Sequence, residues 1–375
     1  MFYIFINYEK RICYTICNSL FKRSEEPIKF EITDEIVSEP CKMNTDNLNK
    51  VDCYDVFILN STDRHIIENL HYIQKNLRDK EILKIWINES YRSIENERLH
   101  EKINTNLIIF FEYKFNEFYN FNWTNNKSFI YEVIASIKKW RNQQKYEICK
   151  KIDVNCYRYY IFDNLAAGVV SHEILGHMME FDNYYHYKYH KIKSILEGFR
   201  LTLYDDPTMI RELGLYLKDD LLVDSKKITI FKDGNFTGDL IGGNYDDGLC
   251  IRNFRRSSYL NKVLLRMSSI YVNGKDLCKS KPQIYILISQ IKRSNINHQC
   301  GTIDFLITES YLVNQGEITF RLPAFSITSK LYEFLSRLTP LDTKKAETML
   351  IRCFKKGQMV NYGINTIDWL LNWKA

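Results

Sequence analysis

The sequence predicts an α+β fold with two domains, a smaller α/β N-terminal domain and a β-rich C-terminal domain that contains a buried metal-binding helix. Three observations lead to this prediction. The chain has 375 residues, which is long enough for two hydrophobic cores. Short apolar runs are mixed with long stretches of helical periodicity up to about residue 150, and strand-like runs dominate after it. Leu165–Met179 combines helical periodicity, small apolar residues and two histidines.

The predicted N-terminal domain covers residues 1–150, and its sequence contains no motif that indicates chemistry. Apolar runs typical of strands lie at Phe2–Tyr8, Ile12–Ile16, Ile28–Ile32, Val56–Leu59, Ile82–Ile87 and Leu107–Tyr113. Apolar residues at helical spacing predict helices at Asp63–Lys80 and Asn125–Cys149. We interpret the second helix as a packing or domain-connecting element. The domain boundary is expected between residues 148 and 155.

The predicted C-terminal domain covers residues 151–375 and is rich in strands and hairpins. Turn signals such as Asp233-Gly234-Asn235 separate its apolar runs. The predicted elements are strands at Tyr159–Phe162, Leu201–Pro207 and Ile284–Ile291, hairpins at Ile228–Leu240 and Asp304–Ile318, and a helix at Leu331–Leu338.

The composition is that of an ordinary globular protein with reduced thiols. The net charge of +6 is spread along the chain, and its basic runs, Lys138–Arg141 and Arg252–Arg256, lack the density of a nucleic-acid-binding surface. Ten cysteines occur without a C-x-x-C pair, which is typical of thiols in the cytosol. No apolar run approaches the ~20 residues that span a bilayer, and Met1–Asn7 has the pattern of a first strand instead of a signal peptide. We therefore expect a cytoplasmic protein that binds neither nucleic acid nor membrane.

The predicted metal-binding helix contains the pattern His-Glu-x-x-x-His, at His172, Glu173 and His177. Imidazole nitrogens are ligands of zinc and similar divalent ions, and a carboxylate beside the first ligand can accept a proton from water at the ion. The five-residue spacing places the histidines roughly 140° apart around an ideal α-helix, at about 100° per residue. Both can bind one ion if the helix widens in a π-bulge, and Gly176 offers backbone freedom for such a bulge.

Other interpretations of these histidines stay open at this point. His172 and His177 can be core histidines that are satisfied by hydrogen bonds, with Glu173 on a solvated face. His186 and His190 are four residues apart and form a rival metal pair, although no acid–base residue accompanies them at a useful spacing.

The stretch from Tyr160 to Asp182 resembles the signature of the TldD/PmbA family of metallopeptidases. The shared features are an apolar strand, a small-residue turn into a helix, His-Glu-x-x-x-His with a glycine before the second histidine, and Glu-x-Asp at Glu180 and Asp182. The resemblance is to the metal-bearing TldD-type member, since the partner-type member lacks the histidines. It covers roughly residues 155–365, so the N-terminal domain is expected to be shortened or divergent.

A second motif, Cys353–Gly363, resembles the family's Cys-Gly-Lys-x-Gly-Gln pattern, in which the cysteine is the third metal ligand. The resemblance therefore implies that Cys353 joins the two histidines and leaves a fourth position open, as catalytic zinc requires. Phe354 stands where the family has glycine, and the small and proline residues that usually follow are missing. Cys300 is a rival third ligand.

The resemblance implies a zinc-dependent peptidase, with another divalent metal as an alternative, that hydrolyses unstructured or extended peptides such as precursor or leader peptides of a maturation pathway. Glu173 would act as the general base, and Glu180 and Asp182 would orient the histidines. Arg266 begins a run that resembles the family's Arg-Met-Thr-Asn-Thr-Tyr, and it binds either a peptide carboxylate or a structural partner. A homodimer, or a heterodimer with a metal-free TldE/PmbA-like subunit, is expected. The alternative function is a peptide-binding subunit of such a complex without catalysis.

Overall fold

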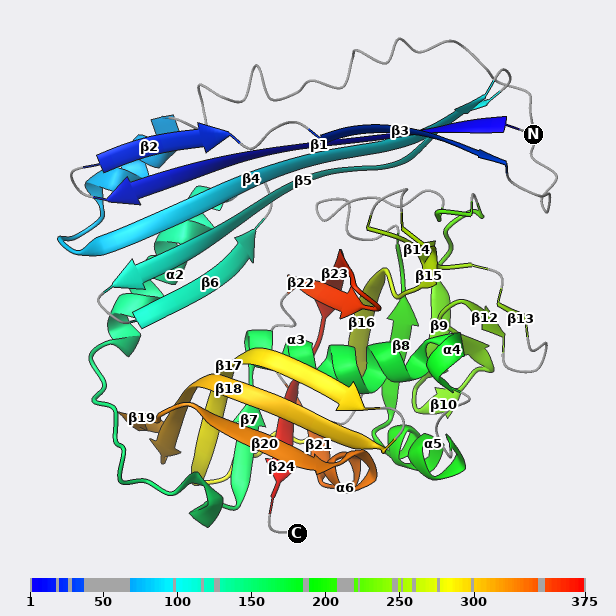
Figure 1. The fold of residues 1–375 in the computed structure, drawn as a ribbon. Helices are drawn as coiled ribbons and strands as arrows, with labels where there is room; N and C mark the ends of the chain where they lie inside the picture. Colours follow the sequence, from blue (N-terminus) through cyan, green and yellow to red (C-terminus); the bar gives the residue numbers. More distant parts are fainter. Residues whose placement is uncertain are drawn as a thin grey trace. The chain divides into compact units, whose positions relative to one another are not determined.

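The computed structural model (Figure 1) describes residues 2–17, 20–25, 29–36, 68–96, 99–115, 118–124, 129–184, 189–207, 219–221, 223–244, 249–250, 252–257, 261–274, 277–297, 300–342 and 348–373. Strands outnumber helices among the described elements, which confirms the predicted α+β fold class. The chain divides into two compact units, each described separately below. The first unit is Met1–Arg141, Ile210–Ser225 and Arg256–Val263, and the second is Asn142–Met209, Lys226–Arg255 and Leu264–Ala375. The predicted boundary near residue 150 stays a prediction.

The first unit is built on an antiparallel sheet of long strands. The strands are β1 Phe2–Cys17, β2 Leu20–Glu25, β3 Lys29–Ile36, β4 Glu81–Asn96, β5 Leu99–Phe115 and β6 Phe118–Thr124. Their order is β2-β1-β4-β5-β6, and β3 also pairs with β1. Helix α2 (Phe129–Gln143) and the helical residues 68–75 share a core with this sheet, in which Leu70, Ile85 and Val133 are fully buried.

The elements of the first unit differ in length from those that the sequence predicts. The predicted strands Phe2–Tyr8 and Ile12–Ile16 are parts of the single strand β1, because the charged residues between them also pair with β4. The predicted helices Asp63–Lys80 and Asn125–Cys149 end early, at residue 75 and at Gln143. The predicted strand Val56–Leu59 lies outside the described residues.

The second unit is rich in strands. They are β7 Tyr159–Phe162, β8 Leu201–Asp205, β9 Ile228–Lys232, β10 Asn235–Phe236, β11 Asp239–Leu240, β12 Gly243–Asn244, β13 Leu249–Cys250, β14 Phe254–Arg255, β15 Leu264–Leu265, β16 Ser269–Gly274, β17 Ile284–Asn297, β18 Thr302–Asn314, β19 Glu317–Arg321, β20 Phe325–Lys330, β21 Leu338–Leu341, β22 Thr348–Lys355, β23 Gln358–Asn365 and β24 Asp368–Asn372. A seven-stranded sheet has the order β19-β18-β17-β7-β24-β21, with β20 paired to β18. A six-stranded sheet has the order β10-β9-β8-β16-β23-β22.

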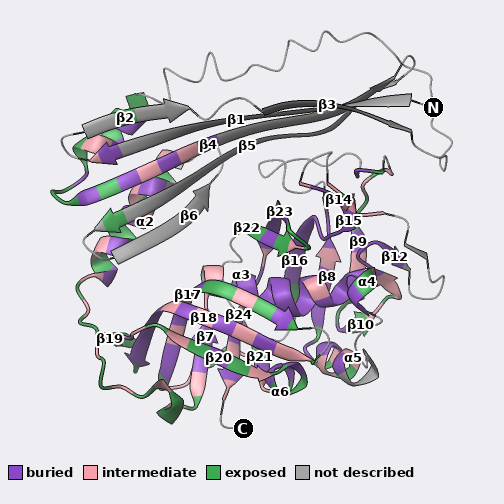
Figure 2. Ribbon diagram, in the orientation of Figure 1, coloured by how far each residue is buried: buried purple, intermediate pink, exposed green. Residues whose placement is uncertain are grey.

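Helix α3 (Asn164–Ser171) packs against both of these sheets. It contacts β7, β17 and β24 of the seven-stranded sheet and β22 of the six-stranded sheet. Figure 2 shows the helix in the colour of buried residues along most of its length. Its last residue, Ser171, accepts a hydrogen bond from Trp369 Nε1 at 2.7 Å and lies 2.6 Å from Thr366 Oγ1. The end of the helix is therefore fixed inside the core, at the residue before the histidine pattern.

The predicted elements of the second unit are largely found. The strand Tyr159–Phe162 is β7, the hairpin Asp304–Ile318 is formed by β18 and β19, and the predicted helix Leu331–Leu338 is α6 (Leu331–Ser336). The predicted hairpin Ile228–Leu240 is shorter, because β11 leaves it and pairs with β12. Helices α4 (Phe181–Tyr184) and α5 (Tyr189–Gly198) follow the histidine pattern.

Among the helices of the described residues, none has the length and apolar character needed to cross a membrane.

Candidate metal centre

The two histidines lie in a π-helical turn, as their five-residue spacing predicts. After α3, a π-helix (η2) spans His172–Gly176 and a 3-10 turn (η3) spans His177–Met179. The backbone N–H of His177 donates to the carbonyl of His172, which is the i→i+5 hydrogen bond of a π-turn. The two rings lie with their centroids 4.4 Å apart. The predicted π-bulge is therefore confirmed.

Gly176 is needed in this turn for its size. Its φ of −74° is available to any residue, so the backbone freedom of glycine is not used. A Cβ atom at this position would lie 2.6 Å from Met267 Sδ and 2.8 Å from Ile270 Cδ1. The π-turn thus approaches β16 and the residues before it so closely that a side chain here would require the Met267 and Ile270 side chains to move.

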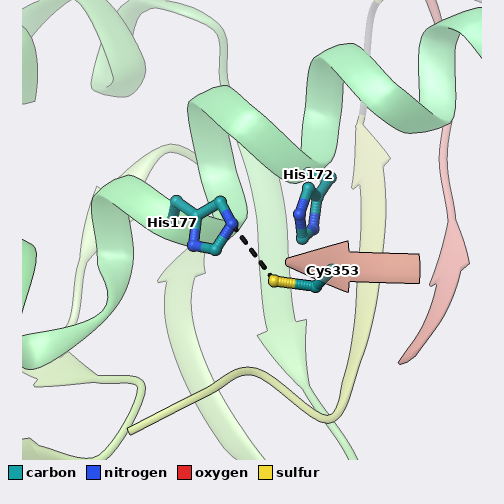
Figure 3. Close-up of side chains that lie close together, drawn as sticks. All are labelled: His172, His177 and Cys353. Carbon is teal, nitrogen blue, oxygen red and sulfur yellow. Dashed lines mark hydrogen bonds between the residues drawn. The ribbon is translucent and has the colours of Figure 1, made fainter. Parts of the chain in front are cut away.

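Cys353 comes from a strand that lies 176 residues later in the chain. It is in β22, close to the β22–β23 turn at Lys356 and Gly357, whose φ angles of 48° and 83° are typical of a type I′ turn. Its Sγ is 3.3 Å from Nε2 of His177 (Figure 3). The candidate ligand atoms of His172, His177 and Cys353 all lie within 4.8 Å of one another. The structure therefore brings together the three residues that were predicted as metal ligands.

A chain of charged groups, largely buried except at Asp182, orients His177. Its Nδ1 lies 3.0 Å from Oε2 of Glu180, so its Nε2 is left to face Cys353. Lys355 donates to the same Glu180 oxygen at 2.9 Å and to the two oxygens of Asp182 at 3.1 and 3.0 Å. Burial raises the pKa of Glu180, but His177 and Lys355 outweigh it and lower the pKa to about 2. Glu180 thus contacts a histidine directly, whereas Asp182 acts through Lys355.

Arg266 is buried beside the thiol. It is 1% exposed, and its Nη1 lies 3.4 Å from Cys353 Sγ and donates to the Cys353 carbonyl at 3.2 Å. Its Nη2 donates to the carbonyls of Lys355 and Gln358, both at 2.9 Å. These bonds hold the tip of the hairpin and place a positive charge next to the sulfur. The position favours the structural interpretation of Arg266, and its contact with substrate stays a prediction.

Glu173 lies on the same π-turn as the two histidines and is held from the seven-stranded sheet. Ser294 in β17 donates to Glu173 Oε1 at 2.6 Å. Burial raises the pKa of Glu173, although the charge of His177 and the bond from Ser294 oppose the rise. A carboxyl group with a raised pKa is a stronger proton acceptor when it is ionised.

The donor set and an unsatisfied buried atom fit a divalent ion. Two imidazoles and a thiol form a zinc ligand set, and bonds of ~2.0–2.3 Å place such atoms about 3.3–3.8 Å apart around a tetrahedral ion. Nδ1 of His172 is buried and has no hydrogen-bond partner among the described residues. Burial, with His177 and Arg266, lowers the pKa of His172 well below its ordinary value. The ring is therefore neutral, which is the form that binds metal.

Of the rival ligands, Cys300 does not join this group. Cys300 is exposed, and its Sγ lies 3.1 Å from Thr302 Oγ1. His186 and the side chain of His190 lie outside the described residues.

Two residues of the site, Lys355 and Ser294, were assigned no role from the sequence. Lys355 lies inside the second motif, two residues after Cys353. Its closeness to a candidate ligand is the feature of the sequence that indicates a role in the site. Ser294 is 121 residues from Glu173, and no local pattern indicates their contact.

Comparison with known proteins places these residues in a family. Residues 158–360, more than half of the chain, match the model of the PmbA/TldA metallopeptidase C-terminal domain. The chain belongs to the PmbA/TldD family. The metalloprotease MJ0996 of Methanocaldococcus jannaschii is 29% identical over 217 residues, which are 54% of this chain and 47% of that relative. The chain thus spans about half the length of the curated relative that it matches.

Solved structures share the fold of this chain beyond the region matched by the family model. TldE from Thermococcus kodakarensis aligns over 99% of this chain and 95% of its own, with a TM-score of 0.63 and 12% identity. A putative modulator of DNA gyrase from Bacteroides thetaiotaomicron aligns over 98% and 94%, with a TM-score of 0.61 and 10% identity. The described residues before 158 therefore share a fold with these structures, although the match to the family model begins only at residue 158.

Replacement of Gly176 tests the packing of the π-turn. Gly176→Ala is expected to lower the free energy of unfolding by about 1–3 kcal/mol, because the methyl group overlaps Met267 and Ile270. It is also expected to reduce bound metal, measured by elemental analysis alongside denaturant unfolding. The matched control is Gly198→Ala, since a Cβ there meets no atom within 4 Å. A Gly176→Ala protein with wild-type stability and full metal content would contradict this account of the turn.

Replacement of single cysteines tests the third ligand. Cys353→Ser is expected to weaken metal affinity by more than the ~10–100-fold that loss of a residue hydrogen-bonded to a ligand typically costs, because it removes one donor atom. Cys300→Ser is the control and is expected to retain the wild-type metal content. Competition with a chelator of known affinity measures both proteins. Loss of metal from the Cys300→Ser protein, with metal retained by the Cys353→Ser protein, would show that Cys300 is the third ligand instead.

Proposed function

We propose that this protein is a zinc-dependent peptidase of the metal-bearing TldD type. The observation that carries the proposal is the convergence of His172, His177 and Cys353, with the carboxyl group of Glu173 on the same π-turn. A different divalent metal can occupy the same ligand set. Unstructured or extended peptides are the proposed substrates, and a precursor or leader peptide in a maturation pathway is one such class.

The roles of the residues follow from their contacts. His172, His177 and Cys353 would hold the ion, which when bound supplies a Lewis acid for a peptide carbonyl and for water. Glu173 accepts a proton from the attacking water and delivers it to the leaving amine. Ser294 holds the Glu173 carboxyl group in place, and Glu180 fixes the orientation of the His177 ring.

A stretch of β17 with one strand partner among the described residues lies beside Glu173 and supports an extended peptide as the substrate. β17 pairs with β7 over Ile286–Ile288 and continues to Asn297 with β18 as its partner among the described strands. Ser294, which contacts Glu173, lies in this continued stretch. An extended peptide can form main-chain hydrogen bonds with such a stretch, and this mode of binding requires little sequence specificity.

A second candidate function is a peptide-binding subunit without catalysis. It is favoured by the hairpin that carries Cys353, where Phe354 replaces the family's glycine. Phe354 is 68% exposed and pairs with Met359, which is 48% exposed, so an apolar pair stands beside the candidate ligand.

In either case we propose a homodimer or a heterodimer with a TldE/PmbA-like subunit, for which the structural likeness to TldE is the support.

Replacement of Glu173 distinguishes the two functions. Glu173→Gln is expected to lower kcat for an unstructured peptide by about 10²–10⁴-fold, because the amide cannot accept the proton. Bound metal is expected to stay at the wild-type level, since Glu173 is not one of the three clustered ligands.

The control for this variant is Glu309→Gln. Glu309 is also buried in the second unit, where it accepts a hydrogen bond from Tyr311 at 2.6 Å. Its variant is expected to cleave at the wild-type rate. A wild-type protein that contains metal but shows no cleavage dependent on Glu173 would favour the binding subunit.

A further inference from the structure

Tyr362 in β23 forms part of the wall of the metal centre. Its ring is stacked on the ring of His172, with centroids 4.0 Å apart and an interplanar angle of 19°. Tyr362 is 2% exposed, and its cross-strand neighbour in the β22–β23 hairpin is Ile351, which is also buried. The position of the Tyr362 ring is therefore fixed by the pairing of β23 with β22 and by the contact of one ring face with His172.

The hydroxyl group of Tyr362 has no acceptor in the described part of the chain, although it is buried. Buried phenol groups normally have a hydrogen-bond partner, and an unsatisfied one is destabilising. The fold thus keeps a polar atom that its own described residues do not satisfy. The ring against which Tyr362 stacks, that of His172, also has a buried nitrogen, Nδ1, without a partner among the described residues.

The surroundings of this hydroxyl group favour a donor instead of a base. Its ring contacts His172, which precedes the buried carboxyl group of Glu173, and the hydroxyl group itself is buried. An uncharged phenol beside these groups can donate a hydrogen bond without adding a buried charge. Such a donor has its largest effect where negative charge develops during a reaction in a site without water.

We propose that the hydroxyl group of Tyr362 donates a hydrogen bond to the carbonyl oxygen of the peptide bond under attack, and this inference rests on the proposed peptidase function. The bond strengthens as negative charge grows on that oxygen, so it stabilises the transition state more than the bound peptide. No proton is transferred, and Glu173 remains the group that accepts and returns the proton. Tyr362 would then be a catalytic residue in addition to Glu173.

The test removes one oxygen atom and keeps the ring. Tyr362→Phe retains the stack on His172, so bound metal is expected to match the wild type, and the unfolding midpoint is expected to be no lower because an unsatisfied buried hydroxyl is removed. Its kcat for an unstructured peptide is expected to fall by about 10²–10³-fold, as for loss of one oxyanion donor, with KM changed by less than threefold. The matched control is Tyr160→Phe, which loses a hydroxyl bond to the carbonyl of Val154 at 2.7 Å and is expected to cleave normally.

A binding measurement separates this inference from the peptidase proposal. A phosphinic peptide, whose tetrahedral phosphorus group resembles the attacked carbonyl, is expected to bind Tyr362→Phe at least tenfold more weakly than wild type by calorimetry. Cleavage by the wild type that depends on Glu173 but is unchanged in Tyr362→Phe would overturn the role of Tyr362 alone. If the wild type cleaves no peptide, equal affinities for the phosphinic peptide, or no binding by either protein, would overturn it as well. If the Tyr362→Phe protein loses metal or thermal stability together with activity, Tyr362 has a packing role instead of a catalytic one.

Discussion

The hydrogen bond from the N–H of His177 to the carbonyl of His172 is the constraint on which the candidate metal centre depends. An α-helical bond pattern here would leave the two imidazoles on different sides of the helix. Because a π-turn is rare and inserts an extra residue into the ladder, the surrounding packing must select it. Ser171 is fixed by Trp369 at the start of the turn, and Gly176 leaves space for Met267 near its end. The buried environment of the helix therefore determines the ligand geometry.

The charges around the turn form a paired set, which explains how so many ionisable groups can be buried together. Glu180 lies 3.0 Å from His177 Nδ1, accepts from Lys355, and receives the N–H of Met267 at 3.3 Å on its other oxygen. Arg266 places its guanidinium next to the thiol of Cys353. Removing one member of such a pair leaves an uncompensated buried charge, which is strongly destabilising. The positions of the ligand atoms are thus fixed by groups that do not themselves offer a ligand.

The parts of the site differ in how far the sequence predicts them. His172, Glu173 and His177 are neighbours in one helix, so their spacing alone predicts the widened turn. Cys353 reaches them from 176 residues away, and only its place in the family motif favoured it over Cys300. Contacts between distant strands have no local sequence pattern. For this reason the sequence predicts two short strands, Phe2–Tyr8 and Ile12–Ile16, where the structure has the single long strand β1. Side-chain alternation identifies a strand, whereas its length depends on the neighbours with which it pairs.

Three consecutive residues link the helix that holds the histidines with the hairpin that holds the thiol. The carbonyl of Leu265 accepts from Lys355, and the guanidinium of Arg266 binds three carbonyls of the β22–β23 hairpin. Met267 packs where a side chain on Gly176 would lie and donates its N–H to Glu180. Leu265 and Arg266 thus contact the hairpin, and the next residue, Met267, contacts the histidine side, so this segment joins the two halves of the centre. The segment therefore helps to hold Cys353 beside His177, and sequence spacing alone does not reveal this link.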